Sequence, residues 1–321
     1  MKIKEKTKVL EITEKFDINI IFAQSLLLAS DGDIDTEKIS NIIKDRPKPF
    51  VKWVGGKRQL LKQFREMDLY PPHDFDPIHN TYFEPFAGGG AVFFDLLPKK
   101  AILSDLNFEL VTTYNVIKND VEALIRSLKK HVYEKEYYLN IRSKKVESLS
   151  DVQIASRFIY LNRTGFNGMY RVNSSGGFNV PFGRYNNPLI CDAENLRKVS
   201  KALQHVTIQH RDYKYVLKKA KKGDFVYFDP PYYPVNRTSN FTGYTSEGFF
   251  EKEQEALRDT FVELHKRGCF VMLSNSDTPF INKLYSGIDK KIKLHKVSAG
   301  RNINSKASGR GKIKEVLVVN Y

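Results

Sequence analysis

Short apolar runs alternate with stretches of helical periodicity from Phe50 to the end of the chain. Such alternation is typical of an α/β fold, in which helices connect the strands of a mainly parallel sheet. The apolar runs predict strands over residues 81–84, 101–104, 207–210, 224–228 and 270–274. Two further runs predict a C-terminal antiparallel hairpin around a loop rich in glycine and serine, over residues 291–297 and 313–320.

This rhythm of strands and helices is interrupted between residues 116 and 203. The interruption begins with a charged helical stretch and ends in residues 162–185, which are rich in glycine, asparagine, arginine and aromatic residues. We therefore expect a mainly helical insert, residues 116–203, between the two halves of a main domain, residues 47–115 and 204–321.

An N-terminal extension, residues 1–46, precedes the main domain. Apolar positions within residues 8–44 recur at helical spacing, with an acidic break at residues 31–35. Pro47 and Pro49 then mark a linker, because proline cannot continue a helix. The sequence predicts a small helical extension.

The charge is unevenly distributed. Basic residues outnumber acidic residues 52 to 37, for a formal net charge of +15. The N-terminal extension holds 8 basic and 9 acidic residues, so the whole excess lies in the main domain and its insert. A surplus of this size favours a polyanionic partner such as nucleic acid, although it also serves solubility.

The cysteines and the apolar segments indicate the cellular compartment in which the protein is expected. Cys191 and Cys269 are the only cysteines and lie far apart, which is typical of a reducing compartment. The longest apolar stretch, residues 18–29, is too short to span a bilayer. The first residues lack the apolar region of a secretory signal. We expect a cytoplasmic protein.

A glycine-rich segment, Phe83-Glu-Pro-Phe-Ala-Gly-Gly-Gly90, follows the first predicted strand and precedes a helix. Glycines at such a turn let the backbone approach a ligand closely. Asp105 follows the next strand, where an acidic side chain can accept hydrogen bonds from ribose hydroxyls. Each feature alone would equally suit a tight turn or a helix cap. Together they predict a site for an adenosine-containing cofactor.

A second motif, Tyr227-Phe-Asp-Pro-Pro-Tyr232, follows an apolar strand, so Asp229 is expected at the carboxyl edge of the sheet, where open α/β folds bind ligands. An adenine amino group is a poor nucleophile, and its activation needs acceptors for both N–H bonds. The Asp229 carboxylate and the Pro230 carbonyl can supply them, while Tyr232 offers a face on which a base can stack. An ordinary turn is the simpler interpretation of Asp-Pro-Pro. The cofactor motif and the basic charge favour catalysis.

These motifs resemble those of the Dam-like DNA adenine N6-methyltransferases, over about residue 50 to the C-terminus. Lys52-Trp-Val-Gly-Gly-Lys57 looks like the family's opening motif, and Asp229-Pro-Pro-Tyr232 looks like its catalytic tetrad. The resemblance implies S-adenosylmethionine as methyl donor and a Rossmann-like methyltransferase sheet. It implies Asp229, Pro230 and Tyr232 as catalytic residues. The implied cofactor-binding residues are Trp53, Lys57, Glu84, Phe86, Gly88, Asp105 and Asp229.

Residues 162–185 are similar to the family's DNA-reading hairpin, so the insert is expected to recognise the target. Arg171 suits the O6 and N7 acceptors of guanine, and Phe166 could fill the space left by a flipped base. The family usually has tyrosine in place of Phe166. A loop with solvated arginines is the alternative interpretation. The implied DNA-binding residues are Lys52, Phe166, Asn167, Met169, Arg171, Arg184 and Tyr185.

No metal is expected. The acidic break at residues 31–35 does not make a calcium loop, because Thr36 stands where glycine is needed and Ile42 where glutamate is needed. The seven histidines show no ligand spacing. A basic loop within residues 298–312 could lie beside DNA or form an exposed hairpin tip.

The predicted function is transfer of a methyl group to N6 of adenine in double-stranded DNA, with GATC as the target that the resemblance implies. Methylation of cytosine N4, RNA adenine or a glutamine amide is the nearest alternative, and a catalytically silent DNA-binding regulator is another. A companion restriction endonuclease could share the site, as in restriction-modification, and an oligomer is not required.

Overall fold

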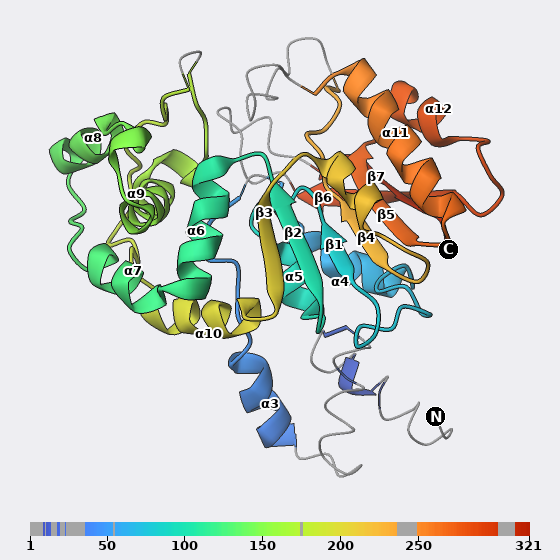
Figure 1. Cartoon of the computed structure of the whole chain (residues 1–321), viewed down its shortest axis with the longest axis horizontal. Coiled ribbons are helices and arrows are strands. Elements are labelled where there is room, and N and C mark those ends of the chain that lie inside the picture. Colours follow the sequence, from blue (N-terminus) through green and yellow to red (C-terminus); the bar gives the residue numbers. More distant parts are fainter. Residues whose placement is uncertain are drawn as a thin grey trace.

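The computed structural model describes residues 36–53, 55–173, 176–235, 249–300 and 312–321, together with residues 9, 11–13, 18, 19 and 23. A twisted sheet lies at its centre, in the strand order β3-β2-β1-β4-β5-β7-β6 (Figure 1). The strands are β1 Tyr82–Glu84, β2 Ala101–Asp105, β3 Val206–His210, β4 Phe225–Phe228, β5 Phe270–Ser276, β6 Lys293–Gly300 and β7 Lys312–Val319. The expected α/β sheet is confirmed, and each strand overlaps the residues predicted for it.

The sheet is parallel from β3 to β5, and β7 then runs antiparallel to both of its neighbours, β5 and β6. The C-terminal hairpin of β6 and β7 is therefore present as predicted. The sequence did not predict that β7, which follows the other described strands in the chain, lies between β5 and β6, with β6 as the outermost strand.

The central strands are buried on both faces, which explains why they are continuous apolar runs. Tyr82 and Phe225 pack into the cluster on one face, whereas the next residues, Phe83 and Val226, pack into the cluster on the other face. The first cluster includes side chains from α4 Arg58–Glu66, α5 Ala91–Leu96, α6 Phe108–Asn119 and α10 Ala193–Leu203. The second includes side chains from η3 Tyr213–Lys218, α11 Glu251–Lys266 and α12 Pro279–Tyr285.

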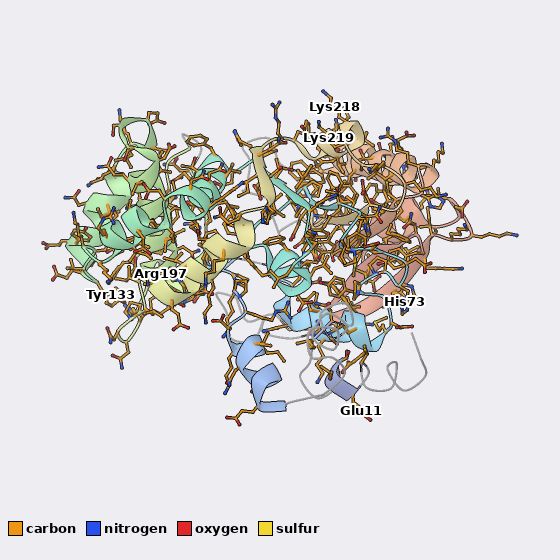
Figure 2. The ribbon with its side chains drawn as sticks, turned by 60° about the horizontal axis from the view of Figure 1, so that its bottom comes forward. Glu11, His73, Tyr133, Arg197, Lys218 and Lys219 are labelled. Carbon is orange, nitrogen blue, oxygen red and sulfur yellow. The ribbon has the colours of Figure 1, made fainter. Side chains whose placement is uncertain are left out.

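A group of helices between α6 and α10 in the chain lies to one side of the sheet (Figure 1). They are α7 Val121–Leu128, α8 Lys135–Ser143 and α9 Asp151–Thr164, with the short turns η1 Val146–Ser148 and η2 Phe166–Gly168. Ser150 caps α9 in a reciprocal capping box with Gln153. Arg197 of α10 pairs with Glu122 of α7 at 2.6 Å, and Figure 2 shows Arg197 at this helical end, with Tyr133.

A buried ion pair joins α6 to α9. Arg157 Nη1 lies 2.6 Å from Glu109 Oε2, and both side chains are less than a tenth exposed. The Nε and Nη2 atoms of Arg157 donate to the carbonyls of Ile141 and Arg142, so each guanidinium nitrogen has an acceptor in the interior. The pair fixes the helical region against the helix that follows β2.

Of the N-terminal extension, the structure describes α3 Thr36–Lys44 and a few residues before it. Most of the helical stretch predicted over residues 8–44, and the acidic break at residues 31–35, lie outside the described residues. The Arg46 guanidinium donates to the carbonyls of Phe94 and Asp95, and the Asn19 amide also donates to Asp95. The extension thus contacts the C-terminal part of α5. In the described part of the chain, no helix is long and apolar enough to cross a membrane.

Candidate active site

Three acidic residues lie at the carboxyl ends of neighbouring parallel strands. Glu84 is the last residue of β1, Asp105 is the last residue of β2, and Asp229 directly follows β4. Because β1 pairs with β2 on one side and with β4 on the other, these ends meet at one edge of the sheet. This edge is where open α/β sheets bind their ligands.

Asp229 forms an ion pair with Lys57 from the loop that precedes α4. Lys57 Nζ lies 2.8 Å from Asp229 Oδ1, and the two side chains are 3% and 23% exposed. The same ammonium donates to the carbonyl of Gly55 at 2.6 Å. The sequence predicted a role for each residue but not their pairing, because they are far apart in the chain.

Burial raises the pKa of the Asp229 carboxyl to about 6, against the effect of Lys57, which lowers it, while the carboxylate of Glu315 raises it further. At neutral pH Asp229 is therefore mainly ionised and can accept hydrogen bonds. Burial also raises the pKa of Glu84 to about 8, so this carboxyl is mainly protonated. Its Oε2 accepts from the Tyr82 hydroxyl at 2.9 Å and from the Phe93 amide at 3.1 Å.

The glycine-rich turn is fixed to Asp105. The Gly88 amide donates to Asp105 Oδ2 at 3.0 Å, and the Asn107 amide donates to Oδ1 at 2.9 Å. Gly88 has a φ of +46°, and a Cβ there would lie 2.7 Å from the Trp53 indole. Only glycine suits this position, which brings Trp53 against the turn. Phe86, in the same turn, stacks on Tyr213 at 5.3 Å.

Tyr232 lies above the Lys57–Asp229 pair. Lys57 Nζ is 4.8 Å from the centre of the Tyr232 ring, and the Tyr232 hydroxyl donates to Glu315 Oε2 at 2.6 Å. Sequence reasoning missed Glu315, although a single acid in the apolar strand Lys-Ile-Lys-Glu-Val-Leu-Val-Val is a visible signal.

Polar side chains from α11 and β5 hold the Asp-Pro-Pro turn. The Gln254 amide donates to the carbonyl of Pro231 at 3.0 Å, and Asn275 of β5 donates to Gln254 Oε1 at 2.9 Å. In the part of the chain that the structure describes, no donor reaches the carbonyl of Pro230. Gln254 and Asn275 were also missed, because nothing in the local sequence links α11 and β5 to the turn.

After α9, residues 165–173 and 176–185 form the two sides of an irregular hairpin, with antiparallel bridges between Gly165 and Phe182 and between Val172 and Phe178. Asn162 fixes the opening motif to it: Asn162 Oδ1 accepts from the Lys52 amide at 2.8 Å, and its Nδ2 donates to the Lys52 carbonyl at 2.7 Å. Asn162 Nδ2 also donates to the Gly168 carbonyl at 2.9 Å, so one side chain joins Lys52 of the opening motif to the hairpin. Asn162 was quoted within the motif but given no role.

The expected DNA-binding residues differ in exposure. Phe166 is 41% exposed, and Arg171 and Arg184 are also exposed. The Arg171 guanidinium donates twice to the carbonyl of Asn179, at 2.6 and 3.0 Å, within the hairpin.

The other expected DNA-binding residues are more enclosed or engaged within the protein. Lys52 Nζ lies 4.4 Å from the Tyr185 ring, whose hydroxyl donates to Gly165. Asn167 has a φ of +55°, and Met169 is half-buried against an aromatic cluster of the helical region. The basic loop expected within residues 298–312 lies largely outside the described residues, and the described residues contain no group of three potential metal ligands.

Comparison with known proteins gives a consistent picture. Residues 53–303 match the family model described as D12 class N6 adenine-specific DNA methyltransferase. The chain is 46% identical over 282 residues to the Type II methyltransferase M1.LlaDCHI of Lactococcus lactis subsp. cremoris, which covers 85% of this chain and 95% of that protein. It is 44% identical over 292 residues to the Type II methyltransferase M.MjaIII of Methanocaldococcus jannaschii, with 85% and 99% covered. It is 33% identical over 274 residues to the DNA adenine methylase of Escherichia coli strain K12, with 84% and 94% covered.

Proposed function

The chain belongs to the D12 class of N6 adenine-specific DNA methyltransferases, and from this membership we propose that it methylates the adenine of GATC sites after rotating that base out of the duplex. The observation that carries the proposal is the Lys57–Asp229 pair at the carboxyl edge of the sheet, beneath the Tyr232 ring. The GATC target itself rests on the resemblance of residues 162–185 to the hairpin of Dam-like enzymes.

The side chains at the edge of the sheet fit S-adenosylmethionine. Each carboxylate oxygen of Asp105 accepts one backbone N–H and keeps capacity for a ribose hydroxyl. Lys57 has three N–H donors, of which Asp229 and Gly55 take two, and a cofactor carboxylate would take the third. When bound, S-adenosylmethionine supplies an electrophilic methyl group on a positively charged sulfur.

Asp229 and Pro230 orient the target amine. The Asp229 carboxylate accepts one N6–H bond and the Pro230 carbonyl accepts the other, which directs the nitrogen lone pair away from the protein acceptors. The two prolines and the Gln254–Pro231 hydrogen bond hold these acceptors in place before the base arrives. Stabilisation by acceptors that need no reorganisation is the main contribution we assign to the protein.

The DNA-reading role of the hairpin is supported by its exposure and by its charge. Arg171 and Arg184 lie on its surface, and the main domain with its insert carries the entire positive excess of the chain. Phe166 is an exposed aromatic side chain that could occupy the space left by the rotated adenine. Tyr232 would receive the base at the other end of its path.

A companion restriction endonuclease is also part of the proposal, because two of the relatives are named Type II methyltransferases. A single chain contributes the cofactor, base and hairpin residues described above, so activity should not depend on an oligomer. Both points can be tested separately from the reaction.

One experiment tests the proposed function directly. Labelled methyl transfer from S-adenosylmethionine is measured with DNA, RNA and protein in parallel, and methylated adenines are mapped in DNA from cells that express the chain. We expect N6-methyladenine in GATC. Methylation of another sequence would overturn the target, and transfer to cytosine N4, RNA or a glutamine amide would overturn the substrate.

A further inference from the structure

Glu315 is a buried carboxylate to which the proposed function assigns no role. It lies on β7 opposite Ser276, the last residue of β5, and it is 9% exposed. Because β7 is antiparallel to β5, the first residues of β7 lie next to the carboxyl ends of β4 and β5. Glu315 therefore lies at the same edge as Asp229, although it comes from the far end of the chain.

A line of contacts connects Glu315 to the acceptor for the target amine. The Tyr232 hydroxyl donates to Glu315 Oε2 at 2.6 Å, a length typical of a bond between a hydroxyl and a charged carboxylate. The Tyr232 ring lies 4.8 Å from Lys57 Nζ, which is itself 2.8 Å from Asp229. Glu315 thus holds the Tyr232 ring, and Lys57 holds the Asp229 carboxylate.

We propose that Glu315 is a positioning residue of the active site, whose carboxylate holds the Tyr232 ring in the orientation in which the target adenine stacks. The proposal rests on the proposed function, since it takes Tyr232 as the stacking surface. Tyr232 follows β4 in a segment without helix or strand, so sheet hydrogen bonds do not orient its ring. A ring held before the base arrives loses less conformational freedom on binding.

The charge of Glu315 has a second effect, on Asp229. The titratable groups that face Asp229 come from four parts of the chain: Lys57 before α4, Glu84 of β1, Tyr227 and Tyr232 around the turn, and Glu315 of β7. The Glu315 carboxylate raises the pKa of Asp229. Removal of this charge should therefore lower that pKa and extend activity to lower pH.

Two conservative substitutions separate these effects. Glu315→Gln keeps an oxygen that can accept from the Tyr232 hydroxyl but removes the charge. Tyr232→Phe keeps the ring and the charge of Glu315 but removes the hydrogen bond. The matched control is Tyr233→Phe: the next tyrosine also donates to a carboxylate, Glu251 at 2.9 Å, but its ring stacks on Phe280.

The steady-state kcat/KM for a GATC duplex is measured between pH 5 and 8. In a second duplex, 2-aminopurine replaces the target adenine, and its fluorescence reports base rotation. For Tyr232→Phe we expect kcat/KM to fall by about tenfold or more, the loss typical of a charge-assisted hydrogen bond, with a weaker fluorescence rise and an unchanged Kd for S-adenosylmethionine. For Glu315→Gln we expect kcat/KM at pH 8 within about threefold of wild type, since a neutral acceptor retains part of the bond. Its acid limb should lie at lower pH, and Tyr233→Phe should match wild type throughout.

A purely structural role of Glu315 would lower the unfolding temperature of both variants without changing these profiles. Wild-type kcat/KM in folded Tyr232→Phe, or an unshifted acid limb in Glu315→Gln, overturns the proposal. Failure of the wild-type protein to methylate adenine contradicts the proposed function instead, and the wild-type arm shows this before any variant is compared.

Discussion

The Tyr170 ring stacks on the Trp53 indole, with ring centroids 6.0 Å apart and an interplanar angle of 23°. Tyr170 belongs to the 162–185 hairpin, and its hydroxyl donates to buried Glu109 at 3.1 Å. Trp53 belongs to the opening motif and abuts Gly88. The contact therefore joins the segment proposed to read DNA to the turn proposed to bind the cofactor.

Tyr170→Ala should weaken cofactor binding as well as DNA recognition, because Trp53 loses the ring that supports it against Gly88. Aromatic pairs contribute enough that we expect the Kd for S-adenosylmethionine to rise about twofold to tenfold. Calorimetric titration measures this Kd, and Tyr170→Phe, which keeps the stack, is the control. An unchanged Kd in Tyr170→Ala would show that the contact serves the hairpin alone.

Asp229→Ala should strongly reduce methyl transfer while the protein stays folded, because it removes one of the two acceptors proposed for the target amine. Loss of one such electrostatic contact lowers turnover by on the order of 10² to 10³. The unfolding temperature should also fall, since Lys57 is 3% exposed and loses its carboxylate partner. Turnover and thermal unfolding are measured on the same preparation, and turnover within tenfold of wild type contradicts the assigned role.

Activity should depend on the ionised form of Asp229. The pKa of this carboxyl is raised to about 6, so kcat/KM should be constant above this pH and fall by about tenfold per pH unit well below it. Since Lys57 lowers this pKa, Lys57→Gln should move the acid limb to higher pH. Exposed Lys62, paired with Glu66 on α4, provides the control Lys62→Gln. If the fall of kcat/KM at low pH occurs at the same pH in Lys57→Gln as in wild type, the group that titrates is not Asp229.

Protonation of Asp229 has opposite effects on the stability of the fold and on activity. Because folding raises the pKa of Asp229, protonation favours the folded state, and this contribution is lost as the pH rises through about 6. The free energy of unfolding, measured over the same pH range as kcat/KM, should therefore not fall on mild acidification. Unfolding would then not explain the loss of activity at low pH.

If Arg171 reads one guanine of GATC, as proposed, Arg171→Ala should narrow the discrimination between GATC and sites altered at that guanine. A bidentate arginine–guanine contact discriminates by about 1–3 kcal/mol, whereas a phosphate contact adds affinity without sequence information. Activity is compared on duplexes altered at each position, with Arg197→Ala as control because its guanidinium pairs with Glu122. Equal loss on every duplex, with a shallower salt dependence, would make Arg171 a phosphate contact.

Removal of residues 1–46 should leave catalysis largely intact, because the described contacts of the extension reach α5 and α10 and not the carboxyl edge. It should lower the unfolding temperature, since Arg46 no longer donates to the carbonyls of Phe94 and Asp95. A shorter deletion, residues 1–35, keeps Arg46 and should be more stable. A folded but inactive product of the longer deletion would show that the extension completes the site.

The strands were predictable because burial on both faces leaves a local signature, as in Phe-Val-Tyr-Phe of β4. The position of β7 was not, because hairpin pairing with β6 follows from the local sequence whereas pairing with β5 depends on the whole sheet. The same distinction applies to the site. Asp229 could be chosen from its motif, but its contact with Lys57 and the contact of Tyr232 with Glu315 join segments that only the fold brings together.

The position of β7 also has a consequence for protein synthesis. Translation produces β7 after the other strands that the structure describes, yet β7 separates β5 from β6 and supplies Glu315. A nascent chain that lacks this strand has an open edge at β5 and no anchor for Tyr232, whatever else has already folded. The surface proposed to hold the target base therefore stays incomplete until β7 has joined the sheet, so its assembly depends on a late step of folding.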